Sequence, residues 1–208
     1  MRSVPDFSIE KNSGKKIIAG VDEAGRGPLC GPVVAAAVVF LKYDFDDMPL
    51  ISDSKQMNEK QREIAYDWIT NNKDIVWSVA QCSATEIDES NILRASLTAM
   101  ARAVNGLSVK AEYCLIDGNK MPDTIIGMAV VKGDAKSLSI AAASILAKVT
   151  RDRLMHELSK KYPEYGWDKN AGYPTQQHLQ AIEKYGINEH YRKTYKPVKE
   201  RLEKNGDS

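Results

Sequence analysis

The sequence predicts an α/β fold of one domain, and three observations support this prediction. The 208 residues are enough for a single domain with a proper hydrophobic core. Short apolar runs rich in Val and Ile alternate with longer segments of helical periodicity. Gly, Pro, Asn and Asp residues bound the short runs, as is typical of buried strands. Strands are expected at residues 16–22, 32–41, 75–80, 113–116 and 125–131.

The segments between these strands predict helices. The first two strands are joined by a loop rich in Gly and Pro and can pair antiparallel. A helix is expected over residues 58–71, with Ile64 and Ile69 on its apolar face. Further helices are expected over residues 92–104, 137–158 and 175–185. The first half of segment 137–158 is apolar nearly all round, which indicates a helix that is buried on several sides.

Composition excludes several classes of protein. The net charge of +1 gives no global basic field, so any nucleic-acid binding must rest on local charge. The three Cys residues are scattered without a Cys-x-x-Cys pair, so neither a disulfide framework nor a zinc site is expected. No apolar run approaches the roughly 20 residues of a membrane span, and no signal peptide is recognisable. We therefore expect a cytoplasmic protein without membrane contact.

The two ends of the chain are expected to differ from the domain between them. Residues 1–15 are polar and predict a flexible N-terminal arm. The domain itself is expected to cover residues 16–208, including a C-terminal helical region from about residue 175.

Carboxylates stand at the ends of three expected strands. Asp22 and Glu23 end the first strand, Asp117 ends the fourth, and Asp134 follows the fifth. Burying an unpaired carboxylate is costly, whereas a bound cation compensates its charge. Ligands in open sheets gather at strand ends, and carboxylate oxygens favour Mg²⁺ or Mn²⁺. The sequence therefore predicts a metal site, where two ions can activate water and stabilise the leaving oxygen of a phosphodiester.

One difficulty concerns the adjacent acids. Neighbouring residues on a strand point to opposite faces of the sheet. Asp22 and Glu23 can therefore share a site only if the strand bends there, or if one of them acts through its backbone carbonyl or a water molecule.

The motif Gly25-Arg26-Gly27 follows these acids directly. The glycines permit positive φ and close approach of a ligand, and Arg26 offers several donors to an anionic oxygen. Asp-Glu before Gly is also compatible with an ordinary exposed turn. Carboxylates for a metal beside donors for a phosphate favour a nucleic-acid hydrolase.

Further motifs occur along residues 17–178. In order they are Gly20-Val-Asp-Glu-Ala-Gly-Arg-Gly-Pro28, Asp53-Ser-Lys55, Ile116-Asp-Gly118, Lys132-Gly-Asp134, the run from Ile140 to Asp152, and Ala171-Gly-Tyr-Pro-Thr175 with His178. Together they resemble the ribonuclease HII family. The resemblance implies a ribonuclease H-like mixed sheet of five strands flanked by helices, with a C-terminal helical extension.

The same resemblance implies an activity. The implied enzyme is a monomer that hydrolyses the RNA strand of RNA–DNA hybrids. It also cuts 5′ of single ribonucleotides embedded in duplex DNA, leaving 3′-hydroxyl and 5′-phosphate ends. The implied cofactors are Mn²⁺ or Mg²⁺ ions, two of them during catalysis.

The resemblance also implies roles for individual residues. The four carboxylates above are the implied catalytic metal ligands. Residues 25–27 are the implied sensor of the ribose 2′-hydroxyl, which is the only group that separates RNA from DNA at a given sugar. Tyr173 is the implied partner that stacks on the next deoxyribose at the RNA–DNA junction.

Other candidate residues keep two interpretations each. Ser54 and Lys55 either contact a phosphate or belong to an ordinary helix cap. Ser144, Lys148 and Arg151 either face the duplex or form a solvated helix flank.

Three further features are open in the same way. Asp152 is expected in a structural ion pair rather than as a metal ligand. His178 either contacts substrate or is satisfied by its neighbours. The basic segment 184–204 forms either a duplex-facing surface or a solvated tail.

Two rival functions remain from the residues alone. One is a non-catalytic binder of hybrid duplexes, which buried acids argue against because a polyanion binder gains nothing from them. The other is a DNA-cutting relative of the same general fold, which has no need of a 2′-hydroxyl sensor.

Overall fold

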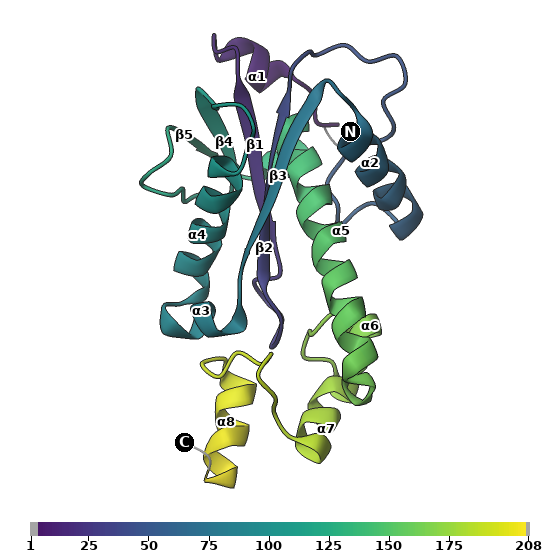
Figure 1. Cartoon of the computed structure of the whole chain (residues 1–208), viewed down its shortest axis with the longest axis vertical. Coiled ribbons are helices and arrows are strands. Elements are labelled where there is room, and N and C mark those ends of the chain that lie inside the picture. Colours follow the sequence, from purple (N-terminus) through teal and green to yellow (C-terminus); the bar gives the residue numbers. More distant parts are fainter. Residues whose placement is uncertain (1–3, 207–208) are drawn as a thin grey trace.

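Two parallel strands lie at the centre of a five-stranded mixed sheet, in a computed structural model that describes residues 4–206. The order across the sheet is β3-β2-β1-β4-β5 (Figure 1). β2 is antiparallel to both β1 and β3, whereas β4 is parallel to β1 and β5 to β4. The strands are β1 (Ile18–Ala24), β2 (Val33–Phe40), β3 (Ile75–Cys82), β4 (Tyr113–Asp117) and β5 (Gly127–Val130). The predicted α/β fold is confirmed.

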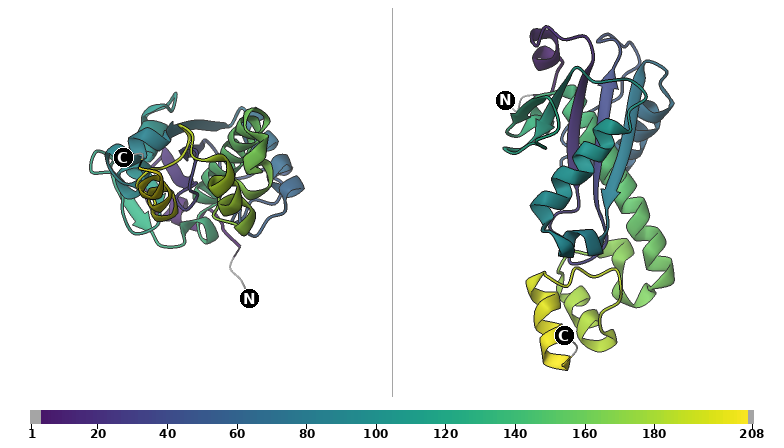
Figure 2. Two further views of the ribbon diagram at one scale, coloured as in Figure 1. Left: turned by 90° about the horizontal axis from the view of Figure 1, so that it is seen from below. Right: turned by 60° about the vertical axis from the view of Figure 1, so that its left-hand side comes forward.

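Helices cover both faces of this sheet. α4 and α5 lie on opposite sides of it, and α7 and α8 lie at the end of the molecule opposite to α1 (Figures 1 and 2). The α-helices are α1 (Ser8–Asn12), α2 (Glu59–Asn71), α3 (Ala84–Glu89), α4 (Ile92–Asn105), α5 (Leu138–Lys161), α6 (Trp167–Asn170), α7 (Gln176–Tyr185) and α8 (Lys196–Asn205), and the 3₁₀ turns are η1 (Gly133–Ala135) and η2 (Pro163–Tyr165). Among residues 4–206, no helix combines the length and the apolar character needed to cross a membrane.

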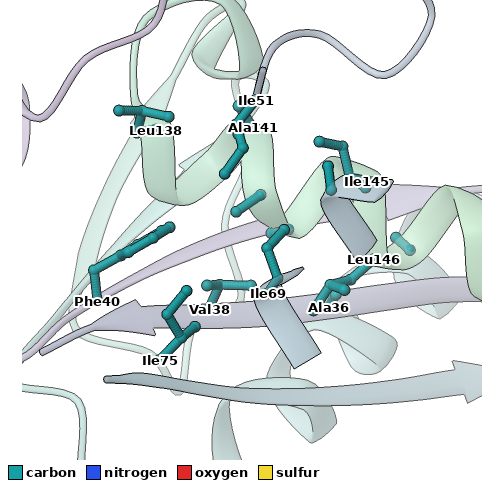
Figure 3. Close-up of a cluster of buried hydrophobic side chains, with 14 of the residues drawn as sticks. Ala36, Val38, Phe40, Ile51, Ile69, Ile75, Leu138, Ala141, Ile145 and Leu146 are labelled. Carbon is teal, nitrogen blue, oxygen red and sulfur yellow. The ribbon is translucent and has the colours of Figure 1, made fainter. Parts of the chain in front are cut away.

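The inner strand β2 is buried on both faces, which explains its continuous apolar sequence. Its alternate residues Ala36, Val38 and Phe40 pack against α5 and α2 (Figure 3). The intervening residues Ala35 and Ala37 belong to a second core, which lies beneath α4. This two-sided burial fixes the register of the sheet, because a slip by one residue would exchange the two cores.

A third apolar cluster joins the C-terminal region to the end of α5 and to the loop between β1 and β2. Its buried members include Leu29, Met155, Trp167, Tyr191 and Val198. The helical region expected from about residue 175 contains α7 and α8, and Thr175 caps α7 by accepting from the His178 amide. The segment 162–174 holds the short elements η2 and α6.

The expected flexible arm differs from the structure. Phe7 is buried in the core between β2 and α5. Glu10 is also buried, and its carboxylate accepts from the hydroxyls of Ser137 and Ser139 and from the Ser139 amide at the start of α5. A helix N-terminus favours an anion there. The arm prediction is therefore wrong for residues 7–10, and residues 1–3 lie outside the described part of the chain.

Replacing Ile69 of α2 by Ala is expected to lower the free energy of unfolding by about 2–5 kcal/mol, because its fully buried side chain would leave a cavity. Ile64, which the helical pattern also placed on the apolar face, is 50% exposed and provides a matched control. Denaturant unfolding of Ile69→Ala and Ile64→Ala measures the difference. Equal losses would contradict the packing of α2 described here.

Candidate active site

Three of the predicted carboxylates converge at one edge of the sheet. Asp22 on β1, Asp117 at the end of β4 and Asp134 in η1 each offer an oxygen, and these oxygens lie within 4.8 Å of one another. Because β1 and β4 are parallel neighbours, their carboxyl ends meet at the same edge. Asp134 arrives from the turn after β5, where the Gly133 amide donates to Asp117 Oδ1 at 2.6 Å.

Glu23 stands outside this three-carboxylate cluster. β1 runs through it as a regular strand, with Val21 in the core beneath α4 and Asp22 close to Ser144 of α5. Alternation by itself would turn Glu23 away from Asp22, yet the two carboxylates interact, and burial and the charge of Asp117 raise the pKa of Glu23. The Glu23 amide donates to Asp22 Oδ1 at 2.7 Å, while its carboxylate pairs with Arg26 at 3.2 Å. Glu23 therefore borders the cluster, close enough to Asp22 and Asp117 to interact with both.

Burial and like charge set the acidity of the cluster. Burial raises the pKa of Asp22 well above its ordinary range, and the charges of Glu23 and Asp117 raise it further. Burial also raises the pKa of Asp134, and Asp117 adds to this effect. Asp22 and Asp134 therefore resist ionisation unless a positive charge lies among the carboxylates. An all-oxygen donor set with this unmet charge fits a hard divalent cation.

Lys55 is the nearest side-chain cation to Asp134, with its Nζ 3.9 Å from Asp134 Oδ2. Burial lowers the pKa of Lys55, but the surrounding carboxylates, Asp22 foremost, outweigh this and raise it overall. Its side chain is 79% exposed and free to reach an anion at the rim. The alternative interpretation as a helix cap is wrong, because Asn58 caps α2 with a full capping box.

A cleft of about 400 Å³ opens beside the carboxylates and gathers most of the predicted site residues. Its lining comes from Glu23, Ala24, Gly25, Arg26, Gly27, Ser54, Lys55, Asp117, Ser144, Lys148, Arg151 and Tyr173. Ser54 is buried, and its hydroxyl lies 2.8 Å from that of Ser144, so these two serines link the segment before α2 to α5.

Gly27 and Tyr173 touch within this cleft, although they are far apart in sequence. A Cβ built on Gly27 would lie 3.3 Å from Cε1 of the Tyr173 ring, which is tighter than an ordinary contact. The Tyr173 side chain is nearly half exposed. The absence of a side chain at Gly27 therefore lets the ring lie directly over the backbone.

Gly25 is required for a different reason. It has a φ of +98°, and a Cβ there would meet Nε of Arg151 at 2.1 Å. The close approach expected at this glycine is thus made by a buried guanidinium of the protein itself.

Two arginines differ from their sequence-based interpretations. Arg151 was expected either at the duplex or on a solvated helix flank, but its side chain points inward and is buried. Arg192 was counted with the basic segment 184–204, and it too is fully buried. Their positive charge gave no hint of this, because Arg is mostly exposed in folded proteins.

The remaining candidates have structural partners. Lys148 pairs with Asp152 at 2.7 Å, as expected for Asp152. His178 is buried and satisfied by its neighbours, with Nδ1 2.8 Å from the Tyr173 carbonyl and Nε2 2.8 Å from the Tyr191 hydroxyl. On α8, Lys196 and Lys199 each face a Glu one turn along the helix.

Comparison with known proteins agrees with this geometry. The family model described as Ribonuclease HII matches residues 19–198. The chain belongs to the ribonuclease HII family. It is 53% identical over 208 residues to the ribonuclease HII of Magnetococcus marinus, which covers 95% of each chain.

Solved structures support the same assignment. The ribonuclease H2 of Pyrococcus horikoshii OT3 superposes with a TM-score of 0.75 at 29% identity, covering 92% of this chain and all of that one. The RNase HII of Archaeoglobus fulgidus, solved in complex with PCNA, gives a TM-score of 0.70 at 26% identity over 86% of this chain and 95% of that one.

Family and fold together make this protein a ribonuclease H, an endonuclease that cleaves RNA in RNA–DNA hybrids. The resemblance found in the sequence is confirmed. The rival interpretation as a non-catalytic hybrid binder is wrong. The family is dependent on divalent metal, and the carboxylate cluster supplies a donor set of the corresponding kind.

The variant Asp22→Asn is expected to raise the melting temperature of the metal-free protein near neutral pH. Because the pKa of Asp22 is raised by folding, the folded protein holds this proton more tightly, and stability falls as the pH rises through the raised pKa. Replacing Asp22 by Asn should increase the free energy of unfolding by about 1.4 kcal/mol for each unit by which folding raises the pKa of Asp22. This increase should vanish below a pH of about 3.9, where Asp is protonated in both states.

Thermal unfolding in EDTA across this pH range measures the effect. The control is Asp47→Asn, since Asp47 is an exposed acid in the loop beyond the opposite end of β2. Identical melting temperatures of Asp22→Asn and the unmodified protein at pH 8 would contradict the inference that ionised Asp22 destabilises the folded protein.

Proposed function

We propose that this ribonuclease H acts as a monomer and cuts 5′ of single ribonucleotides embedded in duplex DNA, besides hydrolysing the RNA strand of hybrids. The products are 3′-hydroxyl and 5′-phosphate ends. The observation that carries the proposal is the contact between Gly27 and Tyr173 in the cleft beside the carboxylates. It offers one surface for a sugar with a 2′-hydroxyl and an adjacent surface for a sugar without one.

Asp22, Asp117 and Asp134 are the proposed ligands of two Mn²⁺ or Mg²⁺ ions, with Glu23 as a fourth. The first three are supported by their close approach, and Glu23 by its position against Asp22 and by its place in the cleft lining. Divalent ions bound there would supply Lewis-acid stabilisation of a phosphodiester and a more acidic water. The chain contributes a buried acidic site in which Asp22 and Asp134 cannot easily ionise without such ions.

Residues 25–27 are proposed to read the ribose. A backbone without side chains at Gly25 and Gly27 lets amide and carbonyl groups approach the minor groove, where the 2′-hydroxyl is displayed. Arg26 is half exposed, pairs with Glu23 and lines the cleft. A guanidinium in that position can donate to a phosphate or sugar oxygen.

Tyr173 is proposed to stack on the deoxyribose that follows the ribonucleotide. Pro174 restricts Tyr173 to an extended backbone, and the Tyr173 carbonyl accepts from the Thr175 amide at 2.8 Å. The ring is therefore fixed from the main chain and exposed on one side. Lys55, which also lines the cleft, is proposed to contact a phosphate, and Ser54 to hold that segment in place.

The variant Asp117→Asn is expected to lose at least about a hundredfold in cleavage, since even an outer partner of a metal ligand costs about 10- to 100-fold. Ions that bind only the folded state stabilise it by about 2.7 kcal/mol at a hundredfold excess over Kd. Mn²⁺ should therefore raise the melting temperature of the unmodified protein. In the double variant Asp22→Asn, Asp134→Asn this rise should be absent.

Cleavage of a labelled hybrid and thermal unfolding with Mn²⁺, Mg²⁺ or EDTA test these expectations. Asp47→Asn is the control and should match the unmodified protein in both assays. If the double variant gains as much from Mn²⁺ as the control, the ions bind elsewhere.

The variant Tyr173→Ala is expected to lose cleavage at a single embedded ribonucleotide by tenfold to a hundredfold, because base or sugar stacking is worth about 1–3 kcal/mol. Tyr173→Phe keeps the ring and should lose less. On a continuous hybrid the loss should be smaller, since no unique junction sets the register there.

The cleavage rates of each variant on the single embedded ribonucleotide and on the continuous hybrid test whether Tyr173 reads the junction. Tyr185→Ala removes a similarly exposed tyrosine at the end of α7 and should leave both rates unchanged. A loss of equal size on both substrates for Tyr173→Ala would make Tyr173 a general contact residue instead of a junction reader.

A further inference from the structure

The loop of residues 25–32, which joins β1 to β2, is held from beneath by two buried guanidinium groups. Arg151 comes from the middle of α5, and Arg192 comes from the segment between α7 and α8. Both side chains are at most 1% exposed. Burial of a permanent charge is costly unless it is fully hydrogen-bonded, so each guanidinium must have a strong set of acceptors.

Arg192 has acceptors along the whole loop. Its guanidinium donates to the carbonyl oxygens of Gly25 at 2.6 Å, Arg26 at 3.0 Å, Pro28 at 2.8 Å and Gly31 at 3.0 Å. The Tyr195 hydroxyl accepts from the same guanidinium and donates to the Arg26 carbonyl at 2.6 Å. Because these carbonyls point to one centre, the loop has little freedom to change shape.

Arg151 connects this loop to the segment that carries Tyr173. It donates to the carbonyl oxygens of Cys30 at 3.2 Å and Pro32 at 3.1 Å, and also to that of Ala171 at 3.0 Å. Ala171 has a φ of +47°, a left-handed backbone that is strained for a residue with a Cβ. One guanidinium therefore spans both segments and holds the strained one in position.

The two segments meet only a short distance from these bonds. The Leu29 amide donates to the Gly172 carbonyl at 2.8 Å, and Gly27 touches the Tyr173 ring. A shift of loop 25–32 relative to segment 171–174 would open that contact. Lys cannot replace Arg here, since an ammonium lacks the planar fork that spans several fixed carbonyls.

We propose that Arg151 and Arg192 are positioning residues that set the spacing between residues 25–27 and Tyr173, and so determine discrimination of the RNA–DNA junction. This inference rests on the proposed roles of residues 25–27 and Tyr173. Neither arginine contacts the reacting phosphodiester in this scheme. Each acts through the backbone that it holds.

The variants Arg151→Lys and Arg192→Lys keep the charge but lose the fork geometry. Each should lower cleavage at a single embedded ribonucleotide about tenfold to a hundredfold, because a misplacement of about 1 Å in a positioned site can cost a hundredfold. Cleavage of a continuous hybrid should fall much less. Arg153→Lys is the matched control, since Arg153 lies two residues further on α5, half exposed beside Glu63.

A double-mutant cycle with Tyr173→Ala separates positioning from general structural damage. If Arg151 acts through Tyr173, the double variant Arg151→Lys, Tyr173→Ala should be no slower at the single ribonucleotide than Tyr173→Ala alone. Losses that multiply would overturn the inference, as would equal losses of Arg151→Lys on both substrates. Circular dichroism and the melting temperature report whether each variant folds, and the same cycle with Arg192→Lys decides the question if Arg151→Lys does not.

The same measurements distinguish this inference from the proposed function. The substrate preference of Tyr173→Ala alone tests junction reading, whereas non-additivity between the arginine and tyrosine variants tests positioning. Tyr173→Ala with equal losses on both substrates but strong coupling to Arg151→Lys would remove the junction role and keep the positioning of Tyr173.

Discussion

Repulsion among Asp22, Asp117 and Asp134 is the constraint on which the rest of the structure depends. Three carboxylate oxygens within 4.8 Å destabilise the folded chain unless cations lie among them. The fold tolerates this because Asp22 and Asp117 stand on the parallel pair β1 and β4, which is buried between two apolar clusters. The apolar packing stabilises the fold enough to offset the repulsion among the carboxylates, which are the candidate catalytic residues. Unfavourable local interactions of this kind, in a fold whose other parts follow the usual rules of packing, are typical of a functional site.

A second feature is the way in which loop 25–32, although irregular, is held in one conformation. Loop 25–32 has no strand partner over most of its length, so its carbonyl groups need hydrogen-bond donors from elsewhere. Arg151 and Arg192 meet that need with donors that are always charged. Glycine at position 25 makes room for one of these guanidinium groups. Motif glycines and buried arginines are therefore parts of one arrangement, even though they come from distant parts of the sequence.

The C-terminal region is connected to the candidate active site by buried hydrogen bonds. Trp167 donates to His178 at 3.1 Å, His178 lies 2.8 Å from the Tyr173 carbonyl, and Tyr191 completes this buried chain. Burial lowers the pKa of His178, and the neutral ring suits a place between these partners. An isolated antiparallel β-bridge pairs the backbones of Cys30 and Tyr191. Together with this bridge, the hydrogen bonds above attach the Tyr173 segment and loop 25–32 to the same small apolar cluster.

The sequence by itself determined the order of the strands and main helices along the chain, because each is encoded by local periodicity and by Gly, Pro and capping residues. It also identified the carboxylates and, through its motifs, the family. Only the tertiary structure decided that Glu23 borders the three-carboxylate cluster, that Phe7 and Glu10 are buried, and that Arg151 and Arg192 point inward. Local patterns carry no information about partners that are 120 or more residues away, as Arg151 is from Cys30. The direction of a charged side chain is settled by the acceptors that the folded chain brings to it.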